Sequence, residues 1–297
     1  MRIESALRTP KSEVSVSQVK IVTDSNAYFP NPERIAQLGI EVIPLAVRVG
    51  QRSYGERVNT SDEDFLRRLG QDASLVSVEA PTRGQMRGIF SRLGQNTGEI
   101  VCIHVSAAFN DVAEVAREAA KSFVGRQRIV IIDTLTTSVG VGLIVEAAAQ
   151  AAADGAPLVE VVRIVRGMVP HVYALLFSDS LEFLEAWGRL GAAQTLLGTM
   201  LGLKPLATME DGDLLPVEKV RHYPRAVDKL YDFIIEFSRI EQMFLLQHGF
   251  ETEAAQLLER LEIAYPGREF PVIGYPPSLA VHIGPKALGV IVYEGVR

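Results

Sequence analysis

Three polar residues that follow one apolar run, His104, Ser106 and Asp111, belong to types that serve nucleophilic catalysis. The run from Ile100 to Val105 is typical of a buried strand, so these side chains lie near its carboxyl end, where open α/β sheets bind ligands. A serine activated by a histidine would support a small-molecule hydrolase or transferase centred on Ser106 and His104. Polar residues at strand ends more often form turns and helix caps, and Asn110 or Asp111 suits the start of the next helix. The spacing allows an enzyme and does not require one.

Established enzyme motifs are absent from the sequence. It has no Gly-x-Ser-x-Gly elbow, no HExxH, no Walker loop and no carboxylate pair at a spacing typical of metal sites. Gly140 and Gly142 open a helix after a strand but lack the third glycine of a dinucleotide fingerprint, so close helix packing explains them better. The single cysteine, Cys102, excludes an internal disulfide and a cysteine-based metal site, and it is predicted to be a buried strand residue.

Length and charge favour an ordinary folded protein of two domains. The chain has 297 residues, 47% of them hydrophobic and 22% charged. The net charge of -6 and the lack of a dense Lys/Arg run argue against nucleic-acid binding. Residues 1–18 lack the apolar core of a secretory signal and are expected to form a loosely ordered tail. No window reaches the about 18 apolar residues of a membrane span. We therefore expect no stable membrane insertion and a cytoplasmic location.

The first half alternates apolar, β-branched runs with helix-like stretches, a pattern that favours βαβ units and a mostly parallel sheet over residues 19–170. The predicted strands are Val19 to Thr23, Val42 to Val49, Ile100 to Val105 and Ile129 to Ile132. The predicted helices are 32–38, 61–69, 82–93, 111–123, a helix capped by Ser138 and stopped by Gly155, and 158–168. The pattern changes after Pro170, which marks the domain boundary.

The second half, residues 171–297, is predicted to be a mixed α+β domain. Strands are expected at Val172 to Phe177, Met243 to Gln247 and Val272 to Tyr275, with helices around 181–187 and 251–265. A hairpin is expected at Glu210 to Asp213. The last two strands, Leu279 to Ile283 and Leu288 to Tyr293, would be joined by a turn at Gly284 to Lys286.

Six motifs in register carry a resemblance to a known family. They are VTDS, IPLAVRV, VIIDTLTTSVGVG, SLEFLEAWGRL, LGLKPLATMEDGDLLPVEKVR and HIGPKALGV. Together they span the chain from Val19 to Gly295, and they resemble the successive signatures of the DegV family.

The resemblance implies two α/β domains of the EDD fold and a long-chain fatty acid buried near their junction. Such proteins present the acid to a separate fatty acid kinase, so this chain would be a non-catalytic lipid carrier with the fatty acid as ligand and no cofactor. A buried carboxylate needs hydrogen-bond donors, whereas the acyl tail needs only an apolar cavity. Helix starts at Thr82 and Ser138 would also favour a negative charge.

The head-group segments of the family are altered here. The family's Thr-Ser-Gln-Pro-Ser aligns with Val78, Glu79, Ala80, Pro81 and Thr82. Only Thr82 keeps a hydroxyl in this register, and a slip of one residue brings in Ser77 instead. In the family's Ser-Ser segment, Ser106 remains and Ala107 replaces the second serine. These changes also leave open a divergent member with a changed ligand.

Two further residues match the family at the expected mouth of the site. Arg189 follows Gly188 in the family's Gly-Gly-Arg turn, and His282 stands in HIGPKALG. A cation and an imidazole beside a cleft suit an anionic head group and a docking partner. The fatty-acid-binding residues implied by the resemblance are therefore Ser77 or Thr82, Ser106, Arg189 and His282. Lys204, Lys219 and Arg221 line either the partner-facing surface or a solvated face.

Overall fold

A four-stranded parallel sheet organises the first half of the protein. The computed structural model describes residues 18–57, 63–70, 76–186, 188, 191 and 197–296. The sheet has the order β2-β1-β6-β7. Its strands are β1 (Lys20–Asp24), β2 (Glu41–Ile43), β6 (Glu99–His104) and β7 (Arg128–Asp133). All three pairings are parallel, as the buried β-branched runs predict.

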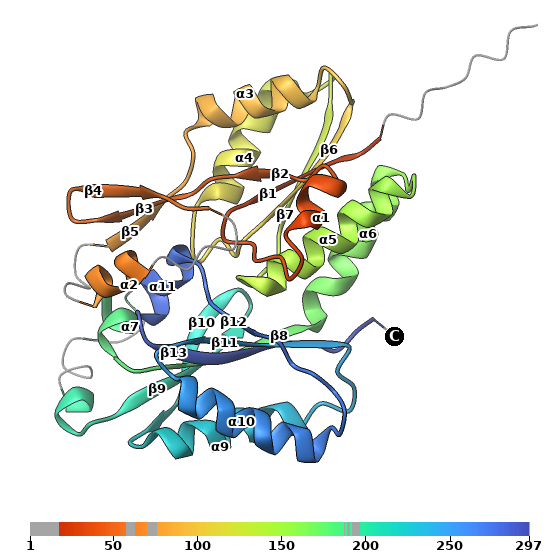
Figure 1. Ribbon diagram of the computed structural model, residues 1–297. Helices are drawn as coiled ribbons and strands as arrows, with labels where there is room; N and C mark the ends of the chain where they lie inside the picture. Colours follow the sequence, from red (N-terminus) through yellow and green to blue (C-terminus); the bar gives the residue numbers. More distant parts are fainter. Residues whose placement is uncertain are drawn as a thin grey trace, which may run out of the picture.

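Helices flank this sheet from two sides (Figure 1). The pair α3 (Arg83–Leu93) and α4 (Val112–Ala120) lies on one side, and α5 (Val139–Ala153) and α6 (Leu158–Met168) lie on the other. The shorter helices are α1 (Glu33–Gln37), α2 (Glu63–Leu69) and the 3-10 turns Lys121–Phe123 and Val169–His171. In α6 the buried residues Leu158, Val161, Val165 and Met168 recur at helical spacing, which directs one apolar stripe into the core.

The single strand predicted for Val42 to Val49 was wrong, because two strands occupy this stretch. After β2 ends, β3 (Ala46–Val49) enters a separate antiparallel sheet of order β4-β3-β5. Its neighbours are β4 (Arg52–Gly55) and β5 (Val76–Glu79). Pro44 lacks an N–H and cannot continue a strand ladder, so the chain changes sheets there.

A mixed six-stranded sheet organises the second half, with the order β10-β9-β8-β13-β11-β12. Its strands are β8 (Val172–Ser178), β9 (Lys204–Glu210), β10 (Asp213–Val220), β11 (Gln242–His248), β12 (Val272–Ile273) and β13 (Ala287–Tyr293). Two long helices, α9 (Tyr223–Ile235) and α10 (Glu251–Ala264), cover it at the bottom of Figure 1. The mixed α/β fold with a parallel sheet and a second mixed sheet is confirmed. So is the predicted hairpin, in which Asp213 pairs with Glu210.

The strand predicted for Leu279 to Ile283 was also wrong, because this segment is the helix α11 (Pro277–Ile283). Pro277 at the first helical position favours a helix start. Nearly every residue of α11 is buried, so the segment lacks the polar-apolar period that separates a helix from a buried strand. Gly284 then ends the helix with a left-handed φ of 87°.

Close packing explains the glycines at the start of α5, as predicted. A Cβ on Gly142 would lie 1.8 Å from the backbone oxygen of Tyr28, and one on Gly140 would lie 2.7 Å from Oγ1 of Thr136. The cap predicted for Ser138 was wrong in detail. Ser138 occupies the N-cap position with a φ of 53°, and its side chain makes no capping hydrogen bond.

The sheets divide along the sequence. Described strands up to Asp133 form the parallel and the three-stranded sheets, and those from Val172 onward form the six-stranded sheet. We therefore keep the boundary at 170/171 as a proposal.

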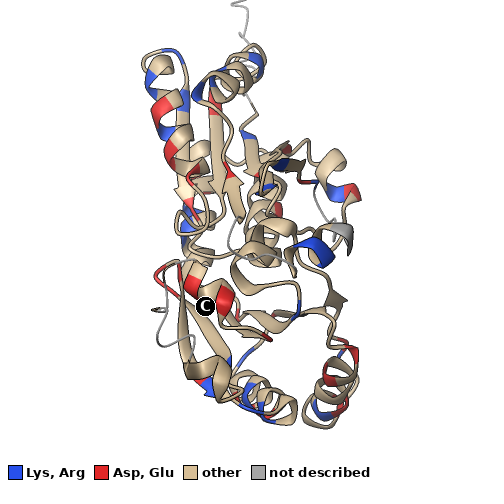
Figure 2. Cartoon of the chain, turned by 90° about the vertical axis from the view of Figure 1, so that its left-hand side faces the viewer, with Lys and Arg blue, Asp and Glu red and all other residues tan. Residues whose placement is uncertain are grey.

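The tail predicted for residues 1–18 lies outside the described residues, Gln18 excepted. Acidic and basic residues are interspersed along the outer helices (Figure 2). None of the described helices is both long and apolar enough to cross a membrane.

Candidate ligand-binding site

A buried Asp-His pair lies where β1 and β6 end. Nδ1 of His104 is 2.9 Å from Oδ2 of Asp24, and the backbone N–H of Val105 donates to the same oxygen at 3.0 Å. Both side chains are fully buried. Nε2 of His104 makes no hydrogen bond to any described residue. An aspartate bonded to Nδ1 of a histidine is part of a catalytic triad. Here, however, no described hydroxyl bonds Nε2 of the histidine, where the nucleophile of a triad would lie.

The hydroxyl of Ser106 is directed to the other half of the molecule. Its Oγ donates to the backbone oxygen of Gly212, in the turn between β9 and β10, at 2.7 Å. The same Oγ accepts from the N–H of Ala108 at 3.3 Å. A serine hydroxyl has one proton, and here Gly212 receives it. In this structure His104 and Ser106 therefore do not form the nucleophile-base pair that a hydrolase centred on them needs.

Three segments meet beside Ser106. The N–H of Phe109 donates to the oxygen of Ser106 at 2.9 Å, and the Phe109 ring lies edge-on to that of His282, with centroids 4.6 Å apart. Oδ1 of Asn110 accepts from the N–H of Val112, the first residue of α4, at 2.9 Å, and its Nδ2 donates to the oxygen of Val78 at 3.1 Å. The Ser106 loop, β5 and α11 are thus held together, and both Ser106 and His282 are buried there.

Thr82 and Ser77 are exposed, unlike the buried Ser106 and His282. Thr82 is exposed and caps α3, because its Oγ1 accepts from the N–H of Gln85 at 3.2 Å and donates to Oε1 of the same residue at 2.9 Å. Ser77 is exposed on β5, opposite Arg48 on β3. Thr82 borders a pocket of about 560 Å³. The apolar residues lining that pocket are Ile43, Pro44, Ala46, Ala80, Pro81 and Ile89.

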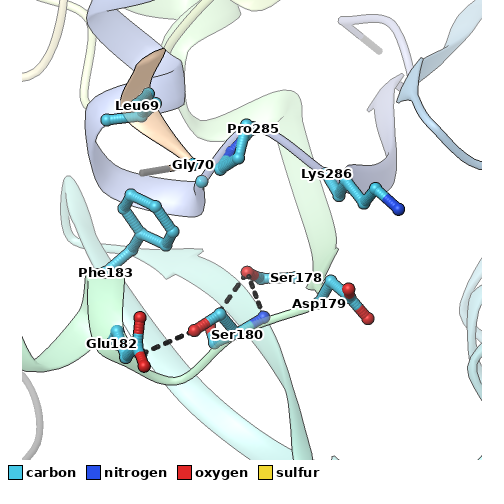
Figure 3. A pocket seen from close by; sticks show the side chains of 10 residues that line it. Leu69, Gly70, Ser178, Asp179, Ser180, Glu182, Phe183, Pro285 and Lys286 are labelled. Carbon is cyan, nitrogen blue, oxygen red and sulfur yellow. Dashed lines mark hydrogen bonds between the residues drawn. The ribbon is translucent and has the colours of Figure 1, made fainter. Parts of the chain in front are cut away.

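Arg189 lies outside the described residues, although the preceding Gly188 has the left-handed φ of 75° expected of a tight turn. A pocket of about 300 Å³ separates α7 (Glu182–Ala186) from the end of α11 (Figure 3). Ser178 joins its walls, since its Oγ donates to the backbone oxygen of Ile283 at 2.6 Å and accepts from the backbone N–H of Ser180 at 3.3 Å.

The basic residues singled out from the sequence differ in their surroundings. Lys204 is ion-paired with Asp179, and its Nζ lies 5.1 Å from the ring centroid of Tyr223. Lys219 and Arg221 are exposed on and just after β10. These contacts tie Lys204 to neighbouring residues, whereas Lys219 and Arg221 remain available to a partner or to solvent.

Sequence reasoning missed a second group of buried polar residues at the same edge of the sheet. Glu56, which follows β4, accepts from the hydroxyl of Ser25 and from the backbone N–H of Ser278, each at 2.7 Å. Burial raises the pKa of Glu56 to about 7. Asn26 donates to Oγ of Ser278 at 2.9 Å. Asn26 follows β1 at a strand end, the signal that singled out Ser106, whereas Glu56 carries no such signal.

Neither a metal nor a reactive thiol is indicated. The described parts of the chain contain no group of three His, Cys, Asp or Glu residues able to hold a metal ion. Cys102 is buried in β6 as predicted, and burial raises the pKa of its thiol far above the usual range. What the geometry offers is a buried, hydroxyl-rich junction between a parallel sheet and a mixed sheet, with an apolar pocket nearby.

Comparison with known proteins identifies the class to which this protein belongs. The sequence model "Uncharacterised protein, DegV family" matches residues 18–295. This chain belongs to the DegV family. A DegV domain-containing protein of Streptomyces coelicolor is 30% identical over 278 residues, which cover 92% of this chain and 98% of that relative.

Two solved structures match over nearly the whole chain. A fatty-acid-binding DegV family protein from Thermus thermophilus has a TM-score of 0.79 at 25% identity, covering 94% of this chain and 100% of its own. DegV from Bacillus subtilis, described as a fatty acid binding protein, has a TM-score of 0.78 at 25% identity, with coverages of 93% and 99%.

Proposed function

We propose that this protein binds a long-chain fatty acid in an apolar cavity and presents the carboxylate to a partner fatty acid kinase. It acts in the cytoplasm without a cofactor and without catalytic activity of its own. The observation that carries fatty-acid binding is the full-length match in sequence and fold to two fatty-acid-binding DegV proteins. The proposal that a kinase is the partner rests on the family resemblance.

We assign the binding of the carboxylate head group to Ser106, Arg189, His282 and either Thr82 or Ser77. Ser106 and His282 are supported by their shared burial and by Phe109, which touches both segments. A carboxylate that accepts the Ser106 proton must displace the oxygen of Gly212. The exchange replaces a neutral hydrogen bond by one to an ionised acceptor, which is roughly twice as strong. Lipid binding then loosens the contact between the β9-β10 turn and the Ser106 loop.

Tail burial supplies most of the binding free energy, at about 0.8 kcal/mol per methylene. The apolar pocket beside Thr82 is a candidate part of the tail cavity, since its lining is mostly Ile, Ala and Pro. Polar groups at the mouth then serve mainly to orient the carboxylate. Their loss should impair transfer to the kinase more than it impairs binding.

The test measures oleate binding and acyl-phosphate formation, with a bacterial fatty acid kinase, on the same preparations. We expect His282→Ala and Arg189→Ala to keep oleate affinity within about threefold and to lower transfer by about tenfold or more. Ser53→Ala, an exposed serine on β4, is the matched control and should change neither quantity. Equal loss of binding and transfer would make His282 and Arg189 ordinary binding or folding residues. Full retention of both would remove them from the site.

A further inference from the structure

Two side chains from the first half of the chain hold the first turn of α11. Oε1 of Glu56 accepts from the backbone N–H of Ser278 at 2.7 Å, and Nδ2 of Asn26 donates to Oγ of Ser278 at 2.9 Å. All three residues are at most 4% exposed. The partners are separated by 222 and 252 positions in sequence, so these two bonds join the two halves of the fold. We call Glu56, Asn26 and Ser278 the clasp.

The clasp is anchored on the edge of the parallel sheet. The second carboxyl oxygen of Glu56 accepts from the hydroxyl of Ser25, at the end of β1, at 2.7 Å. Oδ1 of Asn26 accepts from the hydroxyl of Thr137 at 2.9 Å and from the N–H of Ser138 at 2.8 Å. Because every polar side-chain atom of Glu56 and Asn26 is hydrogen-bonded, neither side chain can move without leaving a buried group unpaired. The sheet edge therefore determines where α11 begins.

His282 lies four residues after Ser278 in α11. Residues four apart in a helix lie on one face, so a displacement of Ser278 moves the imidazole with it. The helix has only seven residues and cannot absorb such a shift along its length. Next to His282 is Phe109, which belongs to the Ser106 loop. The clasp thus determines the separation between the imidazole and the loop that carries Ser106.

We propose that Glu56 and Asn26 are positioning residues, which act through α11 to hold His282 at the fatty-acid head group during transfer to the kinase. The inference rests on the proposed function. A buried carboxylate is costly, and an apolar side chain would pack α11 without that cost. The carboxyl group of Glu56 supplies a directional acceptor, and the site it aligns needs placement to within about half an ångström.

The test is a double-mutant cycle between Glu56→Ala and His282→Ala, with oleate as ligand. Glu56→Ala should lower acyl-phosphate formation about tenfold and leave oleate affinity within about threefold. The double variant should be no slower than His282→Ala alone, because residues that act as one unit are not additive. In Glu56→Ala the His282 ring protons should also change NMR chemical shift, because the ring sits against Phe109.

Matched variants separate positioning from general loss of structure. Glu56→Gln retains an acceptor for the Ser278 N–H and should restore transfer to within about threefold of wild type. Glu99→Gln, which breaks an ion pair to Arg128 at the opposite end of β6, should leave transfer and the His282 shifts unchanged. Should Glu56→Ala fail to fold, Ser278→Ala takes its place in the cycle, because it removes the hydroxyl that bonds Asn26 and Glu56 and keeps the backbone N–H bond to Glu56.

The outcomes distinguish this inference from the proposed function. The positioning role would be overturned if the losses of acyl-phosphate formation in the two single variants multiplied in the double variant. It would also be overturned if the chemical shifts of the His282 ring protons were unchanged in Glu56→Ala. Either result leaves the proposed function in place, provided that the wild-type protein binds oleate and supports transfer. Absence of oleate binding by folded wild-type protein would overturn the proposed function, and the positioning role with it.

Discussion

At Ser106 a single hydroxyl proton links the two halves of the protein, because it is donated to the backbone oxygen of Gly212. The same proton is the one that the proposed carboxylate requires. Ligand binding and contact between the halves therefore compete for one donor. His282 and Glu56 are both buried at this junction, and we propose different roles for them: His282 contacts the ligand, and Glu56 holds the helix that carries His282.

The raised pKa of Glu56 predicts a pH dependence of stability. The folded protein keeps this proton up to about pH 7, whereas the unfolded chain releases it near the ordinary value of 4.5. Between these values the folded state binds more protons, so the free energy of unfolding falls as pH rises, by about 3 kcal/mol for this group. Glu56→Gln does not titrate and should lack this decline. Urea unfolding at pH 4.5, 6 and 7.5 gives the free energy of unfolding of the wild-type protein and of Glu56→Gln. If the two free energies changed with pH in parallel, the decline would not come from Glu56.

At the scale of elements, the packing of α5 against the loop after β1 holds the sheet edge in place. The backbone of Tyr28 approaches α5 so closely that only glycine fits at position 142. That loop also contains Asn26, which bonds the N–H of Ser138 at the start of α5. The contact between helix and loop therefore supports the clasp as well as the core.

Gly142→Ala tests this contact. The new methyl group would collide with a backbone oxygen, which cannot rotate away, so we expect a loss of at least about 3 kcal/mol in the free energy of unfolding. Gly167→Ala in α6 is the control, because its Cβ would meet nothing within 4 Å. It should be neutral or stabilising by up to about 1 kcal/mol. Equal effects of the two substitutions in chemical denaturation would show that α5 and the loop separate at little cost.

At the scale of the whole molecule, apolar runs were enough to predict the parallel sheet and its helices, whereas the β9-β10 hairpin was expected within a stretch that resembles the family. They failed where the local pattern is weak. The strand β4 is mostly exposed, and α11 is buried on nearly all sides, so neither shows the period of its element. Within the candidate site, the position after a predicted strand singled out Ser106, and the family resemblance singled out His282. Glu56 and Asn26 were missed because their partner Ser278 is more than 200 positions away.

The central claim is that this chain carries a fatty acid. Native mass spectrometry of the purified protein, before and after incubation with oleate, measures the occupancy of each intact chain directly. We predict one fatty acid bound per chain, either retained from the expression host or acquired from oleate. A folded protein that shows only the mass of the bare chain in both samples would contradict the account.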